Sequence, residues 1–151
     1  MRIREIGAGE THLAFAAMRE LRRHLTDPAD FARRVDGDQR PEGYRLVGAF
    51  EDGPDAVAVA GFRLAHSLSW GRHVYVDDLS TAAAARRRGH ARALLDWLLA
   101  EAERLGCGEL HLDSGVGPQR TDAHRLYLNA GLTITAHHFA RPAGPRRDRA
   151  R

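Results

Sequence analysis

One stretch of the chain, residues 74–105, limits most strongly what it can fold into. Residues 74–81 are rich in β-branched and aromatic side chains and predict a strand. Beyond Gly89 the apolar residues recur at helical spacing as far as Leu105, and Gly106 follows where a helix often ends in a left-handed residue. The chain therefore passes from a strand, through a basic turn that contains a glycine, directly into a helix.

That turn is suited to an anion. The first N–H groups of a helix lack intrahelical acceptors, and the helix dipole places partial positive charge there. A glycine lets a ligand approach the backbone, and three arginines add full positive charge. The turn predicts a pyrophosphate site, with a solvated basic turn before a core helix as an equally weighted alternative. The residues concerned are Arg86, Arg87, Arg88, Gly89, His90 and Ala91.

Two motifs resemble those of the GNAT N-acetyltransferase superfamily. Arg86-x-x-Gly89-x-Ala91 matches the family's (Arg/Gln)-x-x-Gly-x-(Gly/Ala) signature, whose loop amides hold the pyrophosphate of acetyl-CoA. Residues 123–132 resemble the family's Ala-x-x-(aromatic/aliphatic)-Tyr-x-x-x-Gly-Phe stretch, although Leu132 replaces the phenylalanine. The resemblance implies an α/β (α+β) fold in which helices flank a mixed, mainly antiparallel central sheet. It also implies an N-acetyltransferase that takes acetyl-CoA as acyl donor and an amine as acceptor, which react by direct attack in a ternary complex.

The resemblance assigns Tyr127 the role of the acid that protonates the departing CoA thiolate. A phenol with a pKa of about 10 can give a proton to a thiolate whose conjugate acid has a pKa of about 8.5. The alternative is a ring that packs beneath the cofactor with its hydroxyl bonded to the backbone. Arg120 stands where the family often has an asparagine, so a contact with the cofactor is in question there.

Two neighbouring acids, Asp77 and Asp78, lie on the predicted strand of residues 73–81. Strand side chains alternate between faces, so only one of the pair is expected to face a given site. The resemblance implies that one of them deprotonates the acceptor amine; the slightly favoured alternative is an ion pair with an arginine. His111 and Asp113, on the next strand, are further candidates for the base. Leu79, Ser80 and Thr81 match the strand end where the family uses a bulge to aim N–H groups at the thioester.

The remaining pattern predicts the other elements. Strands are expected at residues 2–6, 44–50, 56–65, 109–113 and 132–139, and helices at 11–25, 28–35 and 121–131, with Thr11 capping the first helix and Asp36-Gly37-Asp38 ending the second. In the family the first two helices shape the acceptor pocket. Candidates for that pocket are His12, Arg19, Arg22, Arg23, Arg40 and Tyr44.

Length and charge bound the organisation of the chain. With 151 residues, 43% of them hydrophobic, residues 1–140 are predicted to form one acyltransferase domain and residues 141–151 a disordered tail. All 23 basic residues are arginines. The tail carries five of them and one aspartate, a net of +4, which leaves about −1 of the formal +3 for the domain. Nucleic-acid binding is therefore expected only through the tail.

The sequence also argues against some kinds of site and leaves two other functions open. No metal site is expected, because His137-His138 lacks the accompanying ligands of a zinc motif. A single cysteine, Cys107, and the lack of a signal peptide or apolar span predict a cytoplasmic protein with no membrane association. A CoA-binding sensor without catalysis and a nucleic-acid-associated protein remain the rival functions. A homodimer is possible. The sequence identifies neither the acceptor nor the length of the acyl chain that the enzyme prefers.

Overall fold

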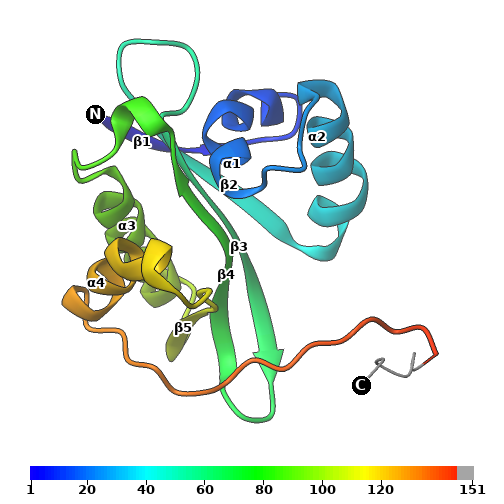
Figure 1. Cartoon of the computed structure of the whole chain (residues 1–151), viewed down its shortest axis with the longest axis vertical. Coiled ribbons are helices and arrows are strands. Elements are labelled where there is room, and N and C mark those ends of the chain that lie inside the picture. Colours follow the sequence, from blue (N-terminus) through cyan, green and yellow to red (C-terminus); the bar gives the residue numbers. More distant parts are fainter. Residues whose placement is uncertain (146–151) are drawn as a thin grey trace. The chain divides into compact units, whose positions relative to one another are not determined.

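A computed structural model describes residues 1–145 and divides the chain into two compact units, Met1–Ser114 and the segment from Gly115 onward. The first unit contains one five-stranded sheet (Figure 1). Its strands, in spatial order, are β1 (Arg2–Ile6), β2 (Tyr44–Phe50), β3 (Ala58–Ser67), β4 (Gly71–Thr81) and β5 (Glu109–Leu112). Neighbours from β1 to β4 are antiparallel, and β5 runs parallel to β4. The predicted mixed, mainly antiparallel sheet is confirmed.

Helices cover both faces of this sheet (Figure 1). On one face α1 (Phe15–Leu21) and α2 (Pro28–Arg34) enclose an apolar core with side chains such as Phe31 and Phe50. On the other face α3 (His90–Arg104) buries Leu94 and Leu98 against residues that include Phe62. The apolar stripe of α3 follows the helical spacing seen in the sequence, so burial of that stripe explains why this helix forms.

The first two helices differ from their predicted forms. The predicted helix from Thr11 begins as a 3₁₀ turn, Thr11–Ala14, and α1 ends at Leu21. Thr11 does not cap it; its hydroxyl donates instead to Asp36, 2.6 Å away. Asp36-Gly37-Asp38, predicted to end the second helix, continues it as a π-helical turn, Val35–Gln39. The Thr11–Asp36 contact joins residues far apart in the sequence, so a local sequence pattern cannot predict it.

β4 contains a bulge, but not at the residues where the family resemblance implied one. Gly61 of β3 pairs with Asp78, whereas the next residue, Phe62, pairs with Val76, so Asp77 is an extra residue in β4. Val76 consequently packs in the core beneath α3, while Asp78, two positions on, bonds to residues beside α1 and α2. Strict alternation, from which we predicted the faces of the two acids, is therefore wrong at this point of the strand.

The second unit contains a 3₁₀ turn, Pro118–Arg120, and α4 (Thr121–Asn129). The predicted strand at residues 132–139 is wrong: these described residues have no regular secondary structure, and Ile134 and Phe139 are 81% and 92% exposed. Apolar and polar residues alternate here as they do in a strand, but a strand also needs a neighbouring strand to pair with its backbone N–H and C=O groups. Most of the tail for which we predicted disorder, residues 146–151, lies outside the described residues.

Within residues 1–145, no helix has both the length and the apolar character needed to span a membrane. The same described part of the chain contains no cluster of three or more His, Cys, Asp or Glu side chains placed to hold a metal ion.

Candidate functional site

The turn before α3 has the backbone that an anion site requires. Arg87 and Gly89 both have positive φ angles, +62° and +83°. A Cβ at Gly89 would meet no atom within 4 Å, so the space above this residue is open. Ala93 makes the first intrahelical bond, to the Gly89 carbonyl at 3.0 Å, so the amides that precede Ala93 are those left without intrahelical partners. The first turn of α3 carries no acidic residue. These features fit a pyrophosphate.

The basic side chains of the turn hold neighbouring elements. Arg88 makes two bonds of 2.9 Å to Glu51 and one of 2.8 Å to the Ala84 carbonyl. His90 is buried and lies 2.8 Å from the same glutamate. Hydrogen bonds from Arg88 and then His90 hold the pKa of Glu51 below its ordinary value. Glu51 was missed by sequence reasoning because no local pattern connects it to a turn 37 residues away.

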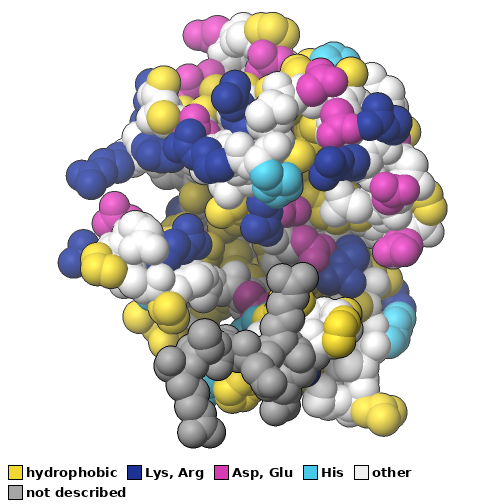
Figure 2. Space-filling model, turned by 45° about the vertical axis from the view of Figure 1, so that its right-hand side comes forward, with side chains coloured by type: hydrophobic (Ala, Val, Ile, Leu, Met, Phe, Trp, Pro, Cys, Tyr) yellow, Lys and Arg dark blue, Asp and Glu magenta, His cyan; other side chains and the backbone are white. Residues whose placement is uncertain are grey.

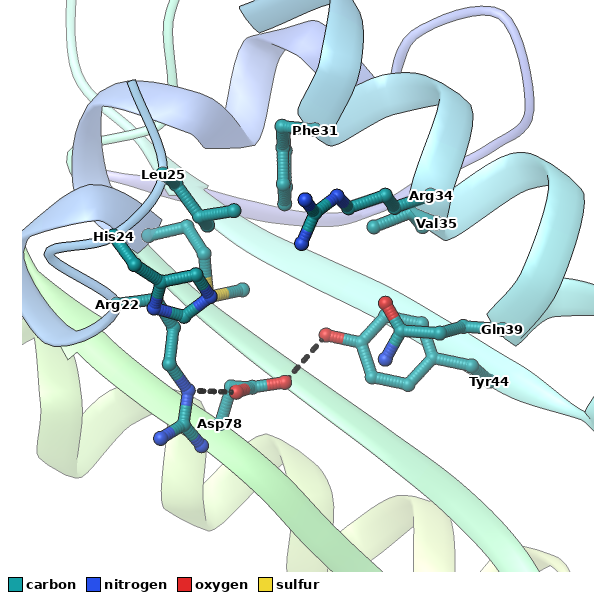
Figure 3. Close-up of a pocket in the computed structure, with 10 residues that line it drawn as sticks. Arg22, His24, Leu25, Phe31, Arg34, Val35, Gln39, Tyr44 and Asp78 are labelled. Atoms are coloured by element: carbon teal, nitrogen blue, oxygen red, sulfur yellow. Dashed lines mark hydrogen bonds and ion pairs between the residues drawn. The ribbon is translucent and has the colours of Figure 1, made fainter. Parts of the chain in front are cut away.

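Asp78 is the best-enclosed acid on β4, at 8% exposure. Its two oxygens lie 2.8 Å from Arg22 Nε and 2.7 Å from the Tyr44 hydroxyl, which donates to it (Figure 3). Arg22 also donates to the backbone carbonyl of Asp77 at 2.9 Å, so the carbonyl of the bulged residue has a hydrogen-bond partner. Burial first, and then the charge of Asp78, raise the pKa of Tyr44 well above its ordinary value.

Tyr44 reaches Asp78 across the strand between them. A Cβ on Gly61 of β3 would lie 1.7 Å from the Tyr44 hydroxyl oxygen, so only glycine fits beneath the phenol. The Tyr44–Asp78 hydrogen bond therefore depends on the pairing of β2, β3 and β4 and on the lack of a side chain at Gly61.

Asp77 has a different environment. Arg63 binds both of its oxygens at 2.8 Å, and the same guanidinium lies 5.3 Å from the centre of the Tyr75 ring. Both acids thus have the arginine partner that we had weighed as the alternative to catalysis. The Ser80 hydroxyl donates to the Ala17 carbonyl at 2.6 Å, so its side chain contacts α1, whereas the predicted donors of residues 79–81 are backbone N–H groups.

Leu79 and Thr81 lie at the end of β4, after the bulge. Leu79 packs against the core beneath α3, and Thr81 pairs with Ala58 of β3. The bulge itself falls at Asp77, two residues before the segment where the family resemblance had placed it.

A pocket of about 170 Å³ opens between the sheet, α1 and α2, with Asp78 and Tyr44 in its polar part (Figure 3). Two of the predicted acceptor residues, Arg22 and Tyr44, line it. Arg40 instead holds Asp36 and the Ile6 carbonyl, each at 2.8 Å. The other lining residues are Met18, His24, Leu25, Phe31, Arg34, Val35 and Gln39. His12, Arg19 and Arg23 are not among them.

The remaining candidates are not among the residues that line this pocket. Tyr127 belongs to the second unit, where burial raises its pKa, and the charge of Arg120 and then its hydrogen bond oppose that rise. His111 stacks on Trp70, with ring centroids 3.6 Å apart, and lies 3.3 Å from Glu109. Asp113 accepts a hydrogen bond from Tyr75. Nε2 of His111 is buried and has no hydrogen-bond partner among the described residues, and the ring packs against Trp70.

The raised pKa of Tyr44 predicts a loss of stability in alkali. Because the folded state holds this phenol protonated, its contribution is complete below pH ~10 and is lost as the pH rises toward the folded-state pKa. The chain has no lysine, so few other groups titrate in this window. We expect denaturant unfolding between pH 8 and 11 to show a smaller decline in unfolding free energy for Tyr44→Phe than for the parent chain. Equal declines would contradict this assignment.

The fold is shared with solved structures. A transcriptional regulator from Bacillus halodurans C-125 matches with a TM-score of 0.79 and 21% identity, covering 93% of this chain and 98% of that one. A ribosomal-protein-alanine N-acetyltransferase from Brucella melitensis biovar Abortus 2308 matches with a TM-score of 0.79 and 20% identity, covering 94% and 99%. The fold is thus one that acetyltransferases adopt.

Sequence comparison specifies the family. Residues 11–132 match the family model described as the acetyltransferase (GNAT) family. An uncharacterized N-acetyltransferase, YhdJ, from Bacillus subtilis (strain 168) is 34% identical over 131 residues, which cover 85% of this chain and 89% of the relative. The chain belongs to the acetyltransferase (GNAT) family.

Proposed function

We propose that this chain moves an acetyl group from acetyl-CoA to an amine by direct attack within a ternary complex. The observation that carries the proposal is the turn before α3, with its open glycine at φ +83° and the amides of a fifteen-residue helix behind it. Membership of an acetyltransferase family supports the acyl chemistry.

On the donor side, the backbone amides of residues 86–91 bind the pyrophosphate. Arg86, which also pairs with Glu20 at 3.3 Å, and Arg87 supply positive charge, and Arg88 and His90 position the turn by holding Glu51. Backbone groups of Leu79, Ser80 and Thr81 orient the thioester and stabilise the oxyanion as it develops.

On the acceptor side, Asp78 is the base that we favour over Asp77, because only Asp78 lines the pocket. A carboxylate can accept about four hydrogen bonds, so Arg22 and Tyr44 leave room for an ammonium or a bridging water. The ammonium gives one proton to Asp78, and the amine nitrogen then bonds to the thioester carbon while the carbonyl electron pair moves to oxygen. The nitrogen releases its second proton to solvent, the carbonyl re-forms as the carbon–sulfur bond breaks, and the thiolate takes a proton from Tyr127, which solvent then reprotonates.

Tyr127→Phe tests the assigned acid. We expect kcat, measured as release of free thiol, to fall about a hundredfold, because general acid catalysis contributes roughly that much. The dissociation constant for acetyl-CoA should change little, since the phenol acts on the leaving group. Tyr75→Phe is the control, because it also removes a phenol hydroxyl, and neither Tyr75 nor its partner Asp113 lines the pocket. Equal rates for the two variants would remove Tyr127 from the mechanism.

Thermal shifts separate catalysis from binding alone. Acetyl-CoA at a hundredfold excess over its dissociation constant adds about 2.7 kcal/mol of stability, or roughly 5–10 °C in melting temperature. ATP, as an anionic control, should not reproduce the shift. A shift with acetyl-CoA but no thiol release with any amine would instead indicate a CoA-binding sensor.

A further inference from the structure

The lining of the pocket beside Asp78 contains groups of both charges. Asp78 contributes a buried carboxylate, which accepts a hydrogen bond from the phenol of Tyr44. Arg34, His24 and Gln39 also line the pocket, and Figure 3 shows the guanidinium of Arg34 turned toward the interior. An ammonium fits the carboxylate and an anion fits the guanidinium.

The rest of the lining includes an apolar surface. Phe31 and Val35 of the second helix, with Leu25 and Met18, form it, and all four side chains are buried. Such a surface accommodates an aliphatic or aromatic body, because burying apolar area there is favourable. The ligand that matches all three regions has an amine, an apolar body and an acidic group.

The charge of the lining and the volume of the pocket further restrict the class of acceptor. The lining holds two arginines and one aspartate, and Arg34 also pairs with Asp30, so the pocket has no excess of negative charge to attract acceptors with several amino groups. The volume of about 170 Å³ is below the ~300–1,000 Å³ typical of drug-sized ligands. A pocket of this size takes a group about as large as one amino acid.

We propose that the acceptor is a free amino acid or a close analogue, with its amine at Asp78, its carboxylate at Arg34 and an apolar side chain on Phe31. The proposal rests on the proposed acetyl transfer and names its substrate class. Arg34 is in this view a specificity-determining residue. It binds Asp30 through Nε at 2.9 Å, which helps to orient the guanidinium.

The test compares L-leucine, L-methionine and L-phenylalanine with their C-terminal amides, which keep the amine and side chain but lose the negative charge. Thiol release from acetyl-CoA should proceed with a kcat/KM at least tenfold higher for the acids. Arg34→Gln should reduce that preference to less than threefold. Arg33→Gln is the matched control, because Arg33 is the neighbouring helix residue, also pairs with Asp30 and does not line the pocket.

Binding is measured alongside turnover, as the thermal shift that each amino acid adds in the presence of CoA. Amino acids that bind, lose binding in Arg34→Gln and yet are never acetylated would support the pocket assignment and contradict the acetyl transfer. Acetylation of polyamines or peptide N-termini with no reaction of amino acids would overturn the assignment and uphold the transfer. Equal use of acids and amides, or no binding of either, would also overturn it.

Discussion

Gly61→Ala should destabilise the first unit by about 3 kcal/mol, since overpacking costs ~1–3 kcal/mol and a buried polar group that loses its partner a similar amount. The new methyl group would lie 1.7 Å from the Tyr44 hydroxyl oxygen and 2.3 Å from the carbon that bears it. Tyr44 must therefore leave Asp78, which loses a hydrogen bond of 2.7 Å. The same displacement should abolish acceptor binding, because Tyr44 lines the pocket. Denaturant unfolding measures the first effect and acceptor titration the second.

A double-mutant cycle isolates the cause. In a Tyr44→Ala background the obstacle is gone, so Gly61→Ala should become neutral or stabilise by ~0.5 kcal/mol through the unfolded chain. Gly48→Ala on the neighbouring strand is the control. Its methyl group would meet the end of the flexible Ile6 side chain at 2.8 Å, and its cost should be the same with and without Tyr44. Additive effects of the Gly61 and Tyr44 substitutions would show that the two residues are not coupled.

Gly89→Asp should weaken acetyl-CoA binding on the order of a hundredfold, because a like charge beside the pyrophosphate costs several kcal/mol. Aspartate tolerates positive φ better than most residues, and a negative charge before a helix favours the helix dipole. Stability should therefore be nearly unchanged while affinity is lost. Isothermal titration of acetyl-CoA, with unfolding measured in parallel, separates the two quantities.

Gly106→Asp is the control variant for Gly89→Asp. Gly106 has φ +71° and open space around it, as Gly89 does, but it lies beyond the C-terminal end of the same helix. Aspartate there opposes the dipole, so it should lower stability slightly and leave affinity intact. An unchanged affinity for Gly89→Asp, or an equal loss in both variants, would contradict a pyrophosphate site at the turn.

Local patterns predicted the parts of the fold that local interactions determine. Leu94 and Leu98 fall on the buried stripe of α3, and Gly89 lies where its spacing placed it, at the start of that helix. The sheet class also followed from the family resemblance. These features depend on residues close together in sequence or on burial of one helix face.

Features that depend on distant partners could not be predicted. The bulge at Asp77 is defined by its pairing with β3, and the Tyr44–Asp78 bond joins residues 34 positions apart. Arg34 enters the pocket only because the second helix packs over the sheet. Residues 132–139 show the converse error, since they have a strand's pattern without a partner strand.

The bulge in β4 has a consequence for how this strand can change in length. Residues 78–81 keep the faces they would have if Asp77 were absent, because the ladder passes over that one residue. Deleting a strand residue between Gly71 and Asp77 would instead reverse the side chains beyond it, turning Asp78 away from the pocket and apolar groups toward it. Asp77 is thus the position at which the chain can gain or lose a residue, by insertion or deletion, while the pocket face of the sheet is preserved.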